Sequence, residues 1–188
     1  MTDFITADTH FCHKNVIDFE TRPFADVDEM NEGIITAWNK AVGKTDTVYH
    51  LGDFCFGGRD KWFDILDRLK GSIVLIKGNH DKTKIVNRTM AEGLLTEVHP
   101  IGTILKRDGM SLNLTHYPLY IGDRHRQFNL HGHIHGNTIG TSYNLNVGVD
   151  NVFAQAMTEG KPFGTPIRLD GLVEEIKQIE NERFGDNE

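Results

Sequence analysis

The chain has 188 residues, of which 38% are hydrophobic and 25% are charged, and its net charge is −7 at pH 7. These proportions are ordinary for a globular protein and predict a single domain, residues 1–188, with a full hydrophobic core. The acidic balance argues against a broad basic surface for duplex nucleic acid, although two bound divalent cations would make one site locally positive.

Three further features of the sequence bear on location. No apolar run is long enough to cross a bilayer, and the first residues lack the basic and apolar segments of a signal peptide. Only two cysteines occur, Cys12 and Cys55, and neither has a zinc-type paired spacing. We therefore expect a cytoplasmic protein that does not enter a membrane.

The first half of the chain alternates between strand and helix patterns. Strands are predicted at residues 4–7, 47–51 and 73–76, the last as a continuous apolar run typical of a strand buried on both faces. Asp26 to Glu29 resembles a capping box that begins a helix, whose apolar face carries Met30, Ile34, Ile35, Trp38 and Val42. A second helix is predicted around residues 62–69, with Gly71 as its terminator.

The second half is richer in strands. Short strands are predicted at residues 101–106, 111–114, 128–131 and 143–147, and an acidic amphipathic helix is predicted at residues 172–184. Strand-helix units followed by a strand-rich half indicate an α/β fold in which two sheets pack face to face with helices outside.

Five short segments that contain histidine, aspartate or asparagine recur in a fixed order. They are Asp8-Thr9-His10, Gly52-Asp53, Gly78-Asn79-His80-Asp81, Thr115-His116-Tyr117 and Gly132-His133-Ile134-His135. The first three follow predicted strands directly, and the active site of an open α/β sheet lies outside the carboxyl ends of its strands. The ordered set predicts two metal ions and the hydrolysis of a phosphate ester.

The predicted ligands are of three chemical kinds. They are the carboxylates of Asp8 and Asp53, the amide oxygen of Asn79, and the imidazoles of His10, His116, His133 and His135. A carboxylate with two oxygens, such as Asp53, is the natural bridge between two ions about 4 Å apart, which together produce a hydroxide at neutral pH. Imidazole with carboxylate suits manganese, iron, zinc or nickel better than magnesium or calcium, and manganese is our first choice.

His80 differs from these ligands. It follows Asn79 and precedes Asp81. A histidine beside the metals but not bound to them can protonate a leaving alkoxide or hold charge on the phosphoryl oxygens. We therefore predict that His80 is catalytic and that Asp81 fixes its tautomer. Taken alone, residues 79–81 could instead cap a helix that starts near Lys82.

In this order the segments resemble the calcineurin-like metallophosphoesterase family over residues 8–135. The opening segment together with Arg22-Pro23-Phe24 resembles a small bacterial and phage branch of that family that lacks a cap domain. The resemblance implies a four-layered α/β/β/α sandwich of two mixed sheets flanked by helices. It places Asp8, His10, Asp53 and His135 on one metal, and it places Asp53, Asn79, His116 and His133 on the other. It also implies that His80 is the catalytic histidine.

Four further residues are candidates for binding substrate, each with a structural alternative. His13 lies near the expected site entrance but could serve in packing, and Arg22 could bind a phosphate or form a salt bridge. Arg124 and Arg126 belong to a basic cluster that could hold an anionic substrate or form a solvated loop.

The interpretation that we favour is a phosphodiesterase that acts on a small, nucleotide-like phosphodiester through a metal-bridging hydroxide. The absence of an inserted cap leaves the expected site open, which suits a diester. A phosphomonoesterase of the same mechanism, a nuclease and a non-catalytic protein-binding scaffold are the alternatives. The retromer scaffold subunit resembles this family, so the fold alone cannot decide. The presence of His80 counts against a scaffold.

Overall fold

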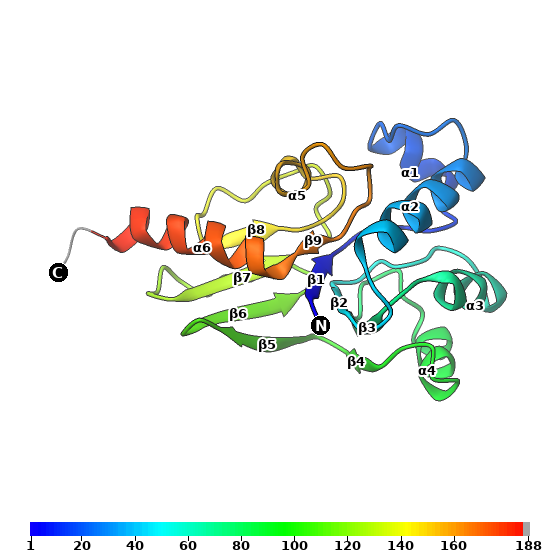
Figure 1. Ribbon diagram of the computed structural model, residues 1–188, viewed down its shortest axis with the longest axis horizontal. Helices are drawn as coiled ribbons and strands as arrows, with labels where there is room; N and C mark the ends of the chain where they lie inside the picture. Colours follow the sequence, from blue (N-terminus) through cyan, green and yellow to red (C-terminus); the bar gives the residue numbers. More distant parts are fainter. Residues whose placement is uncertain (186–188) are drawn as a thin grey trace.

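The structure is a computed structural model in which residues 1–185 are described (Figure 1). Its centre is formed by two mixed sheets. The first sheet has the order β4-β3-β2-β1-β9, and its strands are β1 (Asp3–Thr6), β2 (Thr47–His50), β3 (Ser72–Ile76), β4 (Glu97–His99) and β9 (Ile167–Arg168). The second has the order β5-β6-β7-β8, and its strands are β5 (Gly102–Arg107), β6 (Met110–Thr115), β7 (Gln127–His131) and β8 (Asn144–Asn146).

Six helices flank the sheets within residues 1–185. They are α1 (Lys14–Phe19), α2 (Val27–Ala41), α3 (Arg59–Arg68), α4 (Thr83–Ala91), α5 (Val152–Met157) and α6 (Leu169–Phe184). Helices α1 to α4 lie beside the first sheet, whereas α6 runs along the second sheet (Figure 1). The predicted α/β fold, with two mixed sheets flanked by helices, is confirmed. No helix in this part of the chain combines the length and apolar character needed to span a membrane.

The predicted strands and helices are present, with shifted ends. Asp26 caps α2 through its side chain, which accepts hydrogen bonds from the N–H groups of Asp28 and Glu29. The side chain of Glu29 accepts from the N–H of Ala25, one residue before the position that a capping box requires. Helix α6 begins at Leu169, three residues before the predicted start, and α3 begins at Arg59. Helix α4 begins at Thr83, next to Lys82, where the sequence indicated the start of a helix. Helix α5 and the short strands β4 and β9 were not predicted.

Two hydrophobic clusters hold these layers together. One joins the first sheet to helices α1 to α4 through Trp38 and Trp62, both fully buried. The other joins both sheets to α6 through residues such as Ile5, Leu114 and Ile176. Because burial of apolar surface is the main force in folding, these clusters fix the two sheets relative to each other.

The direction of the strands decides where the site lies. Strands β1, β2 and β3 are mutually parallel in the first sheet, and β6, β7 and β8 are mutually parallel in the second. A bridge between Ala7 and Gly148 joins the chain just after β1 to the chain just after β8. The carboxyl ends of strands from both sheets therefore meet at one edge, as the sequence predicted for the first sheet.

Candidate metal centre

All seven predicted metal ligands lie just beyond the carboxyl ends of strands at this edge. Asp8 and His10 follow β1, Asp53 follows β2 and Asn79 follows β3, while His116 follows β6 and His133 and His135 follow β7. Residues more than 120 positions apart in the chain are in contact there, since the backbone N–H of His133 donates a hydrogen bond to Oδ2 of Asp8 at 2.9 Å.

Asp53 belongs to two groups of side chains that could each hold a metal ion. The ligand atoms of Asp8, His10 and Asp53 lie within 4.8 Å of one another, and so do those of Asp53, His116 and His133. Oδ2 of Asp53 lies 3.6 Å from Nε2 of His10 and 3.4 Å from Nε2 of His116. One carboxylate oxygen therefore faces a ligand of each group.

Asn79 joins the second group directly. Its Oδ1 atom lies 2.8 Å from Nε2 of His116, whose Nδ1 atom lies 2.8 Å from the carbonyl oxygen of Leu51. The backbone carbonyl accepts the proton of Nδ1, which leaves Nε2 as the atom available to a metal.

Two buried atoms in the cluster lack any hydrogen-bond partner among the described residues. They are Oδ1 of Asp8 and Nε2 of His10, on side chains that are almost completely buried. Buried polar atoms are normally hydrogen-bonded, because leaving one unpaired costs about 1–3 kcal/mol. A carboxylate oxygen and an imidazole nitrogen are common metal ligands, so these unpaired atoms fit a divalent ion.

The backbone at this edge adopts an unusual conformation. Five of the seven candidate ligands have positive φ angles, between 49° and 72°: Asp8, His10, Asp53, His133 and His135. Few residues other than glycine adopt such angles, and those that do cluster at functional sites. The folded loops hold these side chains at the strand ends at the cost of local strain.

Glycines make room for the carboxylates. A Cβ atom added at Gly132 or Gly148 would lie 2.5 Å or 2.6 Å from Oδ2 of Asp8, and one added at Gly78 would lie 2.3 Å from Oδ1 of Asp53. Contacts below 3.0 Å are sterically forbidden for a real Cβ atom. Glycine is therefore required wherever the chain passes the two carboxylates.

The electrostatics of the cluster are strongly perturbed. Burial raises the pKa of Asp8 to about 7 and lowers the pKa of His10 to about 3. Burial also raises the pKa of Asp53, but hydrogen bonding and charge from His116 outweigh it and bring that pKa down to about 2. Burial lowers the pKa of His116, but the hydrogen bond and the negative charge of Asp53 outweigh burial and raise that pKa above its ordinary value. Such shifts are typical of functional sites.

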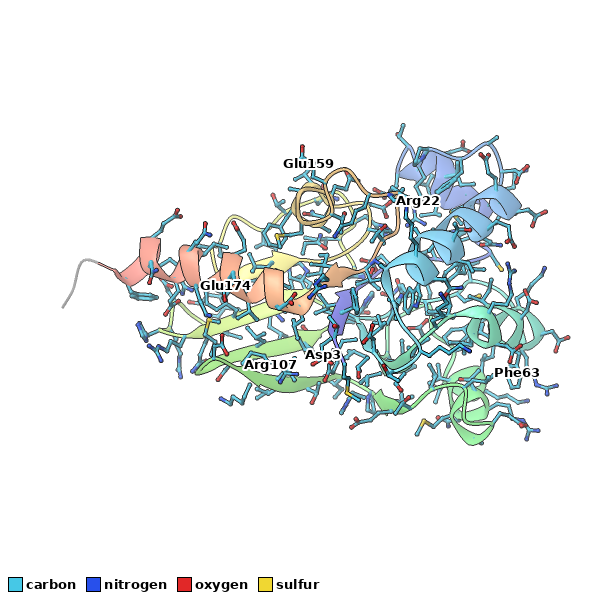
Figure 2. The ribbon with its side chains drawn as sticks, viewed as in Figure 1. Asp3, Arg22, Phe63, Arg107, Glu159 and Glu174 are labelled. Atoms are coloured by element: carbon cyan, nitrogen blue, oxygen red, sulfur yellow. The ribbon has the colours of Figure 1, made fainter. Side chains whose placement is uncertain are left out.

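The structure corrects the role predicted for Arg22. Its guanidinium is buried and forms two hydrogen bonds of 2.8 Å with the carboxylate of Asp150. It also donates to the carbonyl oxygens of Asp8 and Thr9, each at 2.8 Å. All of these contacts are internal, so Arg22 is a buried structural residue. Its guanidinium lies over the ring of Phe163, in the segment before β9 (Figure 2).

Asp150 was missed by the sequence reasoning. Its Oδ2 atom accepts a hydrogen bond from Nδ1 of His135 at 2.9 Å, and Oε1 of Glu20 lies 3.8 Å from the same nitrogen. Nε2 of His135 is thus the atom available to a metal, and the ring of His135 stacks on that of His10 at 5.0 Å. One feature of the sequence could have identified Asp150: its carboxylate follows the end of β8 by four residues, at the same edge of the fold.

The role predicted for Asp81 is also wrong. Its buried carboxylate accepts hydrogen bonds from the backbone N–H groups of Asp53, Phe54 and Gly78, at 2.8–2.9 Å. Both oxygens are used in this way, so Asp81 joins the loops after β2 and β3 and does not set the tautomer of His80. Nor do residues 79–81 cap α4, whose N-cap is Lys82 without a side-chain hydrogen bond.

Arg124 and Arg126 lie far from the ligands, which corrects their prediction as substrate contacts. They precede β7, whereas His133 follows its other end, so the strand alone separates them by roughly 13 Å at 3.3 Å per residue. The backbone N–H of Arg126 donates to Glu180 of α6, and the carbonyl oxygen of Arg124 accepts from Arg183. The basic cluster therefore lies against the end of α6.

His13 and His80 do lie beside the ligands. The ring of His10 is 5.3 Å from that of His13 and 5.6 Å from that of His80, and the backbone N–H of His80 donates to Oδ1 of Asp53 at 2.8 Å.

Two aromatic residues that the sequence reasoning left without a role, Phe56 and Tyr117, border the same cluster. The segment Thr115-His116-Tyr117 already placed Tyr117 next to a ligand.

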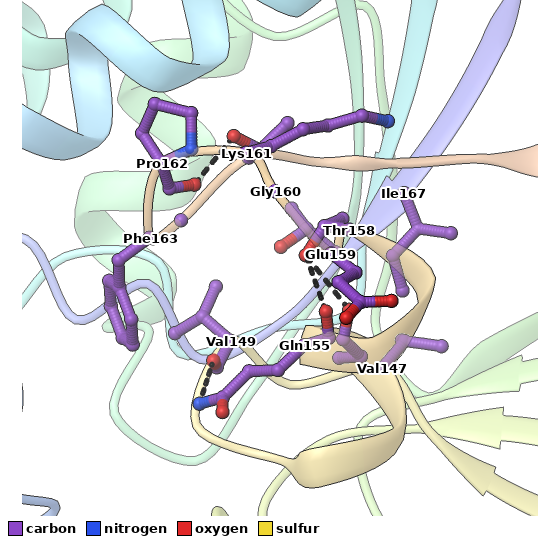
Figure 3. Close-up of a pocket in the computed structure, with 14 residues that line it drawn as sticks. Val147, Val149, Gln155, Thr158, Glu159, Gly160, Lys161, Pro162, Phe163 and Ile167 are labelled. Carbon is purple, nitrogen blue, oxygen red and sulfur yellow. Dashed lines mark hydrogen bonds between the residues drawn. The ribbon is translucent and has the colours of Figure 1, made fainter.

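A separate cavity of about 230 Å³ lies between α5 and the segment before β9 (Figure 3). Val149, Gln155 and Phe163 are among its lining residues, and none of the candidate ligands is. The candidate ligand atoms are gathered beyond the carboxyl ends of the strands and not in this cavity.

Two curated proteins are similar to this chain in sequence. An uncharacterized protein of Methanocaldococcus jannaschii is 44% identical over 81 residues, 42% of this chain and 46% of that protein, so the chain spans less than half the length of this relative. The gene 66 protein of Mycobacterium phage L5 is 31% identical over 180 residues, 78% of this chain and 86% of that protein.

A solved structure and a family model extend the likeness. The crystal structure of a protein of unknown function from Aquifex aeolicus has a TM-score of 0.70 and 25% identity, covering 93% of this chain and 99% of that one. The model of the calcineurin-like phosphoesterase family matches residues 4–176. With a match over most of its length, the chain belongs to the calcineurin-like phosphoesterase family.

Proposed function

We propose that this chain is a single-domain, dinuclear metal-dependent phosphodiesterase that acts on a small phosphorylated substrate. Asp8, His10, Asp53 and His135 would hold one divalent ion. Asp53, Asn79, His116 and His133 would hold the other. Manganese is our first choice of metal, with iron, zinc and nickel as the other ions that suit this set of nitrogen and oxygen ligands.

The observation that carries the proposal is the position of Asp53. Its carboxylate belongs to both ligand groups, with one oxygen directed between Nε2 of His10 and Nε2 of His116. The other oxygen accepts the backbone N–H of His80, which holds the carboxylate in place. When bound, two ions in this arrangement would activate a water molecule for attack on phosphorus and neutralise charge on the phosphoryl oxygens.

His80 is placed to complete the reaction. Its side chain is exposed, and its ring lies next to that of His10 without being part of either ligand group. An imidazole there can donate a proton to the oxygen of the leaving group and regain one from solvent. A purely structural scaffold would have no use for such a residue.

The exposure of the site favours diesters over monoesters. His80, Phe56 and Tyr117 border the ligands and are all exposed. A diester carries an organic group on either side of phosphorus, and an open edge leaves room for both.

Hydrolysis by metal-reconstituted protein tests the proposal. Protein loaded with Mn²⁺, Fe²⁺, Zn²⁺ or Ni²⁺ is assayed on bis(p-nitrophenyl) phosphate and on p-nitrophenyl phosphate. We expect metal-dependent hydrolysis that is faster for the diester and is abolished by a chelator. Faster hydrolysis of the monoester would indicate a phosphomonoesterase. Protein that holds two ions and hydrolyses neither ester would point to the scaffold.

A further inference from the structure

Two aromatic side chains next to the candidate metal centre are half exposed. Phe56 is 47% exposed and Tyr117 is 50% exposed. Each follows a ligand closely in the sequence, since Phe56 comes three residues after Asp53 and Tyr117 comes directly after His116. Each therefore presents ring surface to solvent beside the place where a phosphate would bind.

Phe56 is held against the histidines of the first sheet. Its ring stacks on that of His13 at 4.1 Å with an interplanar angle of 14°, and it lies 5.4 Å from the ring of His80. Its backbone N–H donates to the carbonyl oxygen of Phe11 at 2.8 Å, which anchors the loop after β2. The ring is thus fixed beside the proposed general acid.

Tyr117 is held against the histidines of the second sheet. Its ring lies 4.4 Å from that of His133 and 5.1 Å from that of His116, both nearly edge to face. Its carbonyl oxygen accepts a hydrogen bond from Oγ1 of Thr115 at 2.6 Å, which fixes the turn after β6. Phe56 and Tyr117 therefore contact ligand-bearing segments of different sheets.

We propose that Phe56 and Tyr117 are stacking surfaces for planar groups attached to the scissile phosphate, and that the substrate is a nucleotide phosphodiester. The inference rests on the proposed phosphodiesterase function and assigns the residues that would recognise the nucleotide-like substrate expected from the sequence. Aromatic side chains stack on nucleobases with little preference among bases, because every base has a π face. Rings that are already ordered lose little conformational entropy when they bind.

This placement replaces the basic cluster as the source of substrate selectivity. Arg124 and Arg126 lie at the far end of β7, and the guanidinium of Arg22 is buried against Asp150. Among the phenylalanine and tyrosine rings of residues 1–185, those of Phe56 and Tyr117 are exposed and lie against ligand histidines or His80. Selectivity by stacking predicts recognition of the base and little discrimination between bases.

Two diesters with a common leaving group test the proposal. Thymidine 5′-(p-nitrophenyl phosphate) carries a base, whereas methyl p-nitrophenyl phosphate does not. Phe56→Leu and Tyr117→Leu retain apolar bulk but remove the ring, and Tyr117→Phe retains the ring without the hydroxyl. Phe63→Leu is the control, because Phe63 lies in α3, where its ring packs against Arg59 (Figure 2).

We expect the double variant F56L/Y117L to raise KM for the thymidine ester by about 5–100-fold, the usual range for loss of base stacking. The change for the methyl ester should be smaller. Tyr117→Phe, which keeps the ring, should raise KM for the thymidine ester less than Tyr117→Leu does, and Phe63→Leu should resemble the parent protein on both esters. A double variant that hydrolyses both esters with the parent ratio of KM values would overturn the inference.

A binding measurement separates this inference from the proposed function. Thymidine monophosphate is titrated calorimetrically into the metal-loaded parent protein and into the double variant, whose metal content is checked first. If neither ester is hydrolysed, the proposed function fails, yet weaker thymidine monophosphate binding by the double variant would still support stacking. Equal affinity of the two proteins would contradict it.

Discussion

Oδ2 of Asp150 accepts a hydrogen bond from Nδ1 of His135 at 2.9 Å. The same carboxylate is paired with the guanidinium of Arg22, which also holds the carbonyl oxygens of Asp8 and Thr9. Through these bonds one buried ion pair positions a histidine from the second sheet against the first ligand-bearing segment of the chain. Carboxylate partners of this kind fix the tautomer and orientation of metal-binding histidines.

The first expectation concerns the stability of this ion pair. Asp150→Asn leaves the buried guanidinium of Arg22 without its counter-charge, which typically costs about 3–5 kcal/mol of unfolding free energy. Denaturant unfolding of the protein without metal measures this loss independently of activity. Asp170→Asn is the matched control, because Asp170 pairs with Arg168 and both side chains are exposed. An exposed ion pair contributes about 0–1 kcal/mol.

The outcome for the metal follows from the same contact. The Asp150→Asn variant should bind the metal ion proposed for Asp8, His10, Asp53 and His135 more weakly. A loss of about 10–100-fold is the usual effect of removing a hydrogen-bond partner of a ligand. Unchanged stability and unchanged metal affinity would together show that the pair has no positioning role. An effect of equal size in the Asp170→Asn control would show the same.

A second expectation separates proton transfer from metal binding. His80→Ala should leave both ions in place and reduce turnover by about 10²–10⁴-fold, the usual contribution of a positioned general acid or base. The loss should be smaller for an aryl ester, whose leaving group scarcely needs a proton. Steady-state kinetics on an aryl and an alkyl diester measure the two losses. If they are equal, His80 is not the general acid.

A third expectation concerns the effect of pH on metal affinity. Burial raises the pKa of Asp8 to about 7. Burial lowers the pKa of His135, but its hydrogen bond with Asp150 and the nearby carboxylates outweigh burial and raise that pKa. In the protein without metal, Asp8 is therefore partly protonated near neutral pH, and protonation of His135 is favoured beyond its ordinary range. A metal that binds these groups must displace their protons. Affinity should fall as the pH falls from about 8 to 6, by about tenfold per unit for each displaced proton.

Calorimetric titrations in buffers of different ionisation enthalpy count the protons that metal binding releases. Proton release that grows as the pH falls through 7 supports the assignment of Asp8 and His135 as ligands. Metal affinity that is independent of pH would contradict it, because metal binding would then displace no proton from either group.

Much of the fold followed from local patterns in the sequence. The apolar run 73–76 became β3, and the amphipathic pattern from Met30 to Trp38 became α2, because both patterns match the burial of the residues. Helices α1 and α5 have only six residues each and carry few buried apolar side chains, so no periodic pattern indicated them. Strand β9 has two residues and depends on pairing with β1 across 160 positions.

The candidate site also has parts that local sequence patterns predict and parts that depend on distant partners. Its seven candidate ligands lie together because each follows a strand end, a rule that can be applied to the sequence alone. The roles of Arg22, Asp81 and Asp150 depend on partners distant in the sequence, 128 residues apart for Arg22 and Asp150. The spacing of residues along the chain carries no information about such pairs. Arg22 and Asp81 were therefore predicted to take part in the chemistry, whereas their side chains bind backbone groups.

Metal content of the parent protein and of Asp53→Asn tests the central claim most directly. If the carboxylate of Asp53 is shared, the parent protein should bind two metal equivalents, whereas Asp53→Asn, which keeps the shape but loses the charge, should bind fewer and lose activity. Elemental analysis of the dialysed proteins gives both numbers. Two full equivalents in an active Asp53→Asn variant would contradict the shared site.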